Sequence, residues 1–114
     1  MSKEPVEYLK HIRDESFYLL SVTAKGINKE DFLNDETLKR DVVRSLEIIG
    51  EATKKIPADF KLKWSNVKWK EMAGMRDRLI HDYMGVNYSI VWDVIKNKIS
   101  ELNEQVIEVL EKES

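Results

Sequence analysis

Apolar residues return every three or four positions through four long segments of the chain, which is the spacing of one buried face of an α-helix. We predict the first helix over roughly residues 4–25, because Pro5 suits a first helical turn and Gly26 follows the last periodic residue. Its apolar face is expected to comprise Val6, Leu9, Ile12 or Arg13, Phe17, Leu20 and Ala24. Residues 28–31 then form a connector, either irregular or with a short turn of helix.

A second helix is predicted to begin after Asn34 or Asp35, either of which can cap it, and to end at Pro57. Its expected apolar face comprises Leu38, Val42, Leu46, Ile49, Thr53 and Ile56. From Pro57 to Asn66 the helical period is broken, so this segment is predicted to be a short helical or irregular connector.

Two further helices follow this connector. The face of the third is expected to comprise Trp69, Met72, Ala73, Arg76, Leu79, Ile80 and Tyr83. Gly85 suits the position after its end, and Asn87 can cap the fourth helix, with Val86 and Val91 as a hydrophobic staple. The fourth face continues through Ile90 or Val91, Val94, Ile95, Lys98, Leu102, Val106 and Val109. Because no segment alternates as a strand would, the pattern predicts an all-α antiparallel four-helix (up-down) bundle, as one domain over residues 1–114.

Gly50 and Gly74 interrupt the second and third helical patterns, where a glycine costs about 1 kcal/mol relative to alanine. One hypothesis is that the two helices approach closely where these side chains are absent, which would fix the helix that carries Arg76. The alternative is a glycine on a solvated face, and the sequence leaves both open.

Composition narrows the class of protein. The chain has no cysteine, which excludes a disulfide framework and a thiolate metal site and is typical of the cytoplasm. The N-terminal segment MSKEPVEYLK lacks the apolar core of a signal peptide, and no apolar run approaches the ~20 residues that span a bilayer. We therefore expect a cytoplasmic protein with no membrane partner.

The charges are unevenly distributed along the chain, although the net charge is only −2. Residues 1–53 sum to −3, residues 54–78 to +5 and residues 79–114 to −4. The basic segment also contains Phe60, Trp64 and Trp69, and such a mixture of cations and aromatic rings favours single-stranded nucleic acid. Its candidate RNA contacts are Lys68, Lys70 and Arg78. The alternative is a solvated lysine face beside aromatic core anchors.

The segment GMRDRLIHDYMG, residues 74–85, brings together Arg76, His81 and Tyr83. Arg76 and Tyr83 are seven residues apart and share one helix face, whereas His81 lies roughly 140° around the axis from Arg76. Convergence then needs the long arginine side chain, a distorted last turn, or a second copy of the helix across a two-fold axis. A symmetric dimer would place two arginines and two histidines around one cleft.

This set of side chains suits cleavage of an RNA phosphodiester without a metal or cofactor. His81 can remove the 2′-hydroxyl proton or protonate the leaving oxygen, and Arg76 can hold the charge that develops on phosphate. Asp77 or Asp82 can orient the imidazole, and Tyr83 can donate to a phosphate oxygen or be modified. Such residues before a glycine also serve as caps for free carbonyls, so spacing alone does not decide between catalysis and capping.

The arrangement Arg76-Asp77-x-x-x-His81-x-Tyr83 resembles the R-x-x-x-x-H-x-Y signature of HEPN-domain ribonucleases, in particular the HepT-like toxins. All motif positions match, and the similarity covers most of the chain. It includes Tyr8-Leu9-x-His11-Ile12, Arg44-x-Leu46-Glu47-Ile48-Ile49-Gly50-Glu51-Ala52, Trp69 with Met72-x-Gly74-Met75, and Val91-Trp92.

The resemblance implies a HEPN-like helical toxin that acts as a homodimer and cuts RNA without metal in a cleft between the protomers. It implies that Arg76 and His81 are catalytic and that Asp77 supports them. It further implies a nucleotidyltransferase antitoxin that neutralises the toxin by adding AMP to Tyr83. The resemblance gives Glu47 and Glu51 no role, and we expect His11 to be structural.

Two other functions are compatible with these residues. The chain could be a non-catalytic helical module that binds a nucleotidyltransferase, since related bundles serve as accessory domains. It could also be a structural dimerisation bundle, in which case Arg76 and His81 could be replaced without functional effect.

Overall fold

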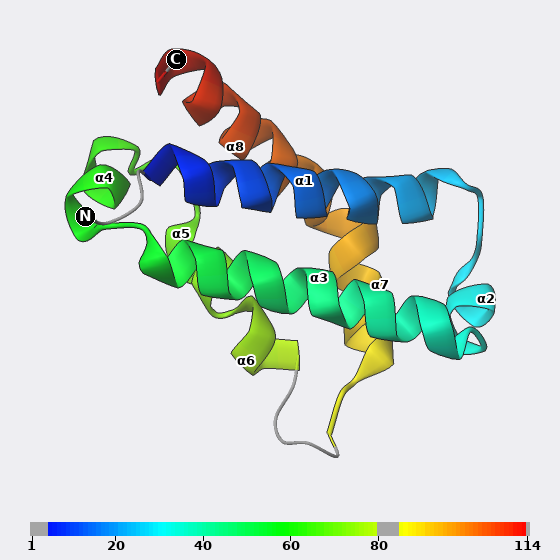
Figure 1. The fold of residues 1–114 in the computed structure, drawn as a ribbon. Coiled ribbons are helices and arrows are strands. Elements are labelled where there is room, and N and C mark those ends of the chain that lie inside the picture. The colour runs from blue at the N-terminus through cyan, green and yellow to red at the C-terminus, as the bar shows by residue number, and fades with distance from the viewer. Residues whose placement is uncertain (1–4, 80–84, 114) are drawn as a thin grey trace.

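A computed structural model describes residues 5–79 and 85–113, with side chains for residues 5–77 and 85–113. The two longest helices, α1 (Pro5–Ala24) and α3 (Glu36–Lys55), run side by side in opposite directions (Figure 1). On its other side α1 packs against α8 (Ile99–Glu113), and α7 (Tyr88–Asn97) leads into α8. The all-α prediction is confirmed.

The helix starts follow from capping side chains. Asp35, rather than Asn34, caps α3, because its carboxylate accepts a hydrogen bond of 3.0 Å from the backbone N–H of Leu38. Asn87 caps α7 as predicted, accepting from the N–H of Ile90 at 3.1 Å. These side-chain oxygens satisfy backbone donors that the first helical turn leaves unpaired.

Both predicted connectors contain short helices. The first holds α2 (Lys29–Leu33), whose Phe32 is fully buried with its ring centroid 5.4 Å from that of Trp92 on α7. The second holds α4 (Ala58–Lys63). The prediction that a short helical or irregular segment precedes the Arg76 helix is therefore confirmed.

The third predicted helix is broken into α5 (Trp69–Ala73) and α6 (Met75–Leu79), so the expectation of one continuous helix up to residue 79 is wrong. Gly74 is the residue between them, and its N–H donates to the carbonyl of Lys70 at 3.0 Å as a helix cap. The fourth predicted helix is also divided, at Lys98. There the N–H of Lys98 still bonds Val94 and its carbonyl still accepts from Leu102, so hydrogen bonding continues across the junction.

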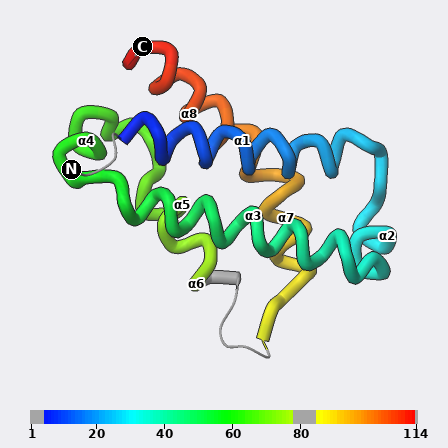
Figure 2. Tube along the Cα trace, viewed as in Figure 1, coloured from blue at the N-terminus to red at the C-terminus, as the bar shows by residue number. Residues whose placement is uncertain are grey.

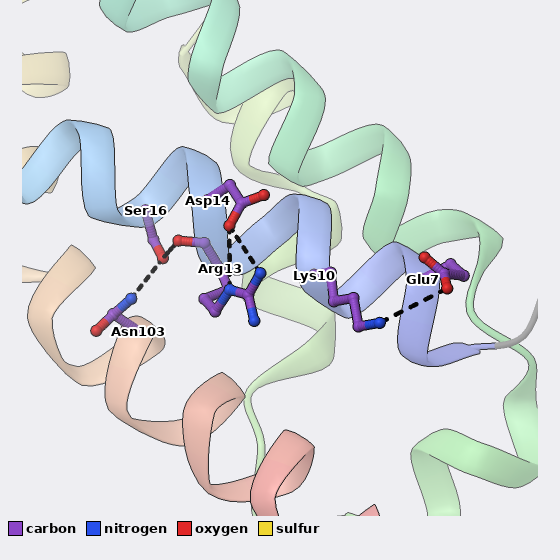
Figure 3. A network of polar contacts seen from close by, with 6 residues as sticks. All are labelled: Glu7, Lys10, Arg13, Asp14, Ser16 and Asn103. Carbon is purple, nitrogen blue, oxygen red and sulfur yellow. Dashed lines mark hydrogen bonds and ion pairs between the residues drawn. The ribbon is translucent and has the colours of Figure 1, made fainter. Parts of the chain in front are cut away.

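The buried face of α1 differs from the predicted one. Phe17 is 48% exposed, whereas the polar Ser16 is fully buried. Figure 3 shows how Ser16 is satisfied: its hydroxyl donates to the carbonyl of Arg13 at 2.9 Å and accepts from the amide of Asn103 on α8 at 2.8 Å. The buried face of α1 therefore includes this polar pair. It comprises Leu9, Ile12, Ser16, Leu19 and Val22.

Gly50 lies where α3 meets the junction between α5 and α6. Figure 2 shows α5 and α6 beside α3. A Cβ atom at Gly50 would lie 3.4 Å from the carbonyl oxygen of Ala73 and 3.6 Å from the backbone N of Arg76. The predicted close approach is therefore confirmed at Gly50. It is wrong for Gly74, where a Cβ would meet the carbonyl of Lys70 in its own helix at 3.3 Å and no described atom of α3 within 4 Å.

Within the described ranges, none of the helices is both long enough and apolar enough to cross a membrane.

The Gly50 contact predicts a large difference between two substitutions. Gly50→Leu should lower the free energy of unfolding by about 1–3 kcal/mol, because its side chain must displace the backbone at Ala73 and Arg76. Gly50→Ala should change it by no more than about 1 kcal/mol, since a methyl group makes near-normal contacts and favours the helix. Chemical denaturation measures both values, and equal stability of the Leu variant and the wild type would contradict the close approach.

Candidate functional site

The candidate site begins on α6, which presents Arg76 towards α3. Arg76 lies close to α3 at Gly50, because a Cβ added there would lie 3.7 Å from the Arg76 Cβ. The Arg76 side chain remains 43% exposed. The backbone of the arginine thus packs close to α3, and its side chain is partly exposed to solvent.

Two carboxylates contact the Arg76 guanidinium. Its Nε lies 3.5 Å from Oε2 of Glu47 on α3, and its Nη1 lies 3.5 Å from Oδ1 of Asp77. The other carboxylate oxygen of Asp77 lies 3.5 Å from Nζ of Lys54, also on α3. Positions 47, 50 and 54 follow helical spacing, so one stripe of α3 supplies Glu47, Gly50 and Lys54 to the site.

We name these four charged residues, Glu47, Lys54, Arg76 and Asp77, the α3–α6 charge cluster. Its members alternate in sign along the contacts and sum to zero formal charge. Solvent reaches all four side chains, with Glu47 the most covered at 26% exposure. Ion pairs this exposed contribute at most about 1 kcal/mol each, so the cluster orients side chains more than it stabilises the fold.

The structure brings together only part of the predicted motif. Arg76 and Asp77 are adjacent and in contact, with Nη1 of Arg76 3.5 Å from Oδ1 of Asp77, and the supporting role of Asp77 stays a prediction. His81, Asp82 and Tyr83 lie outside the described residues, and so does the side chain of Arg78. The convergence of Arg76 with His81 therefore stays a prediction.

Sequence reasoning missed the roles of Glu47 and Lys54. Both come from another helix, and neither has a motif of its own. A signal was nevertheless present, because Glu47 precedes Gly50 by three residues and Lys54 follows it by four. Side chains at these positions flank whatever segment packs on the glycine.

The basic segment is only partly available for RNA. Trp69 is 8% exposed, and its indole N–H donates to the carbonyl of Trp64 at 2.9 Å, so its ring is a core anchor and offers no stacking face. Lys68 pairs with Glu101 at 2.9 Å, and this hydrogen bond raises the pKa of Lys68. Lys70 is exposed and, with Lys68, lines an open groove of about 750 Å³ along α4 and α5.

Among the described side chains, no group of three or more histidine, aspartate or glutamate residues is arranged to hold a metal ion. Glu47 and Asp77 are instead each in contact with a cationic side chain.

Comparison with known proteins shows which family the sequence matches. The sequence profile of the family described as Ribonuclease HepT-like matches residues 6–109. A candidate RNase of Caldanaerobacter subterraneus subsp. tengcongensis is 55% identical over 111 residues, covering 97% of this chain and 98% of the relative. A candidate ribonuclease HepT of Thermococcus cleftensis is 43% identical over 102 residues, covering 90% and 92%.

A relative from Methanocaldococcus jannaschii, named as a gamma-glutamylcyclotransferase and candidate RNase, is 39% identical over 112 residues. The alignment covers 98% of this chain but 50% of that relative. No solved structure matches the chain.

Proposed function

The chain belongs to the HepT-like ribonuclease family, and from this we propose that it is a metal-independent endoribonuclease and the toxin of a type II toxin–antitoxin pair. The observation that carries the proposal is the Arg76-x-x-x-x-His81-x-Tyr83 motif within a family match of this extent. The position of Arg76 supports it, since the residue packs against α3 at Gly50 and its side chain is 43% exposed.

In the proposed reaction the 2′-oxygen attacks the adjacent phosphorus and the bond from phosphorus to the 5′-oxygen breaks. His81 takes the 2′-hydroxyl proton or gives a proton to the leaving 5′-oxygen. Arg76 stabilises the additional negative charge on the phosphate oxygens. Asp77 supports Arg76. The products are a 2′,3′-cyclic phosphate and a 5′-hydroxyl end, and water can then open the cyclic phosphate to a 2′- or 3′-phosphate.

We place the reaction in a cleft between two protomers of a homodimer. On one straight helix, His81 points away from Arg76, and a two-fold axis would bring the motif of one protomer to that of its partner. The exposed end of Arg76 is compatible with such an arrangement. Lys68, Lys70 and Arg78 are proposed to bind the RNA backbone beside the cleft, with Lys70 the freer of the two described lysines because Lys68 pairs with Glu101.

A nucleotidyltransferase antitoxin is proposed to neutralise the protein by AMPylation of Tyr83. The added phosphodiester and base would occupy the space where RNA phosphate binds, so steric exclusion and charge repulsion would both oppose the substrate.

Cleavage of total cellular RNA in excess chelator tests the catalytic proposal. The wild type should cut and leave cyclic or 2′/3′-phosphate ends, whereas His81→Ala should lose about 10²–10⁴-fold in rate through loss of proton transfer. Arg76→Ala should lose about 10²–10³-fold through loss of charge stabilisation. His11→Ala is the matched control, because His11 is the other of the two histidines and is exposed on α1. Cleavage that survives in His81→Ala, or that the chelator abolishes, would contradict the mechanism, and folded dimers that never cut would favour the non-catalytic binding module.

Replacement of Tyr83 tests the proposed modification. After co-expression with a minimal nucleotidyltransferase, intact mass should show one AMP on the wild type and none on Tyr83→Phe. The Phe variant should also keep its ribonuclease activity in the presence of the partner. Tyr88→Phe is the control for loss of a tyrosine, because Tyr88 is the first residue of α7 and lies outside the motif. A silenced Tyr83→Phe protein that still carries AMP would exclude this residue.

Sedimentation equilibrium tests the composite cleft. The active protein should have twice the chain mass of 13.4 kDa. A monomer that cuts RNA at the same specific activity would overturn the two-protomer site while leaving the ribonuclease assignment intact.

A further inference from the structure

The stripe of α3 that faces α6 contributes a carboxylate directly to the proposed catalytic arginine. We propose that Glu47 is a positioning residue, whose carboxylate holds the Arg76 guanidinium in the orientation that receives the RNA phosphate. This inference rests on the proposed ribonuclease function and adds to it a residue from outside the motif.

The need for a positioning residue follows from how Arg76 is held. The backbone and Cβ of Arg76 pack against α3 at Gly50, where an added Cβ would lie 3.6 Å from the Arg76 nitrogen and 3.7 Å from its Cβ. The remaining bonds of an arginine side chain rotate, and 43% exposure leaves them room to do so. A flexible guanidinium would lose conformational entropy each time it binds the phosphate. A fixed partner reduces this loss and increases the population of the productive geometry.

Glu47 is well placed to restrict that rotation. It comes from α3, one turn before Gly50, so the residue beside the Arg76 backbone and the residue that contacts its Nε are on one helix. Asp77 contacts Nη1 and also pairs with Lys54. The Arg76 side chain keeps 43% exposure beside these two carboxylates, so phosphate oxygens can reach it.

The same contact could act against the reaction, because a carboxylate competes with phosphate for a guanidinium. The two effects differ in the kinetic constant that they change. Loss of a positioning group lowers kcat, whereas loss of a competitor lowers KM and raises kcat/KM. Lys54 pairs with Asp77 and offsets its charge, so the α3–α6 charge cluster has no net negative charge that would repel phosphate. This favours the positioning role of Glu47.

The kinetic experiment uses the full-length protein and a short RNA that contains one cleavage site mapped in total RNA. Glu47→Ala should lower kcat about 10-fold or more with KM little changed, as loss of a supporting group does. Glu47→Gln, which keeps the side-chain length and an acceptor oxygen, should stay within about threefold of the wild type. Glu51→Ala is the matched control: it removes the same charge from the same helix at an exposed position that borders Tyr8 and His11 rather than Arg76.

A second measurement reports on positioning without activity. In protein labelled with ¹⁵N-arginine, the Nε–H signal of Arg76, identified by its loss in Arg76→Lys, should have a higher order parameter in the wild type and in Glu51→Ala than in Glu47→Ala. Equal order parameters in all three proteins would overturn the proposal, whether or not the protein cleaves RNA.

The kinetic outcomes are equally decisive. A kcat of Glu47→Ala equal to that of the wild type, or a rise in kcat/KM, would overturn positioning while Arg76→Ala remains inactive and the ribonuclease assignment stands. A lower Tm with unchanged kcat per folded molecule would show a purely structural role and overturn it as well. If the wild type does not cleave RNA, the proposed function fails, and the order parameters alone decide whether Glu47 orients Arg76.

Discussion

The site depends on the close approach of α3 to the junction of α5 and α6. At Gly50 this approach leaves room for a methyl group, which would lie 3.4 Å from the Ala73 carbonyl and 3.6 Å from the Arg76 nitrogen, but not for a larger side chain. The same helix buries Leu46 and Ile49 in the core. The packing that stabilises the bundle and the contact that sets the position of Arg76 are therefore made by adjacent residues of one rigid element, and a rotation of α3 would disturb both.

Helical periodicity was sufficient to predict the long helices, because α1 and α3 each bury one face and have recognisable start signals. It was insufficient where polar or flexible residues decide the local structure. Ser16 and Asn103 look like surface residues until they are seen to satisfy each other in the core. A helix contact and a solvated face were both open for Gly74 from the sequence, and the structure shows that it terminates α5 instead. A glycine lowers helix stability in either role, so the residue alone does not distinguish them.

Part of the candidate site could be predicted from neighbouring residues in the sequence, and part depends on contacts between distant residues. Arg76 and its neighbour Asp77 could be identified from a short motif, and the described structure places them in contact. Glu47 and Lys54 could not, because they reach the site from a helix more than twenty residues earlier and their partners follow from tertiary packing. The contribution of His81 and Tyr83 remains a prediction, since both lie outside the described residues.

The link between α1 and α8 joins residues 87 positions apart, and it bears on when the protein can fold during its synthesis. The segment with Arg76 emerges from the ribosome before α8 does, whereas α1 has its second packing surface only when α8 is present. Contacts between residues far apart in the sequence are slow to form, because they close a long loop. The pairing of α1 with α8 therefore forms only after α8 has been synthesised, whereas the contacts of α3 with α5 and α6 can form before it.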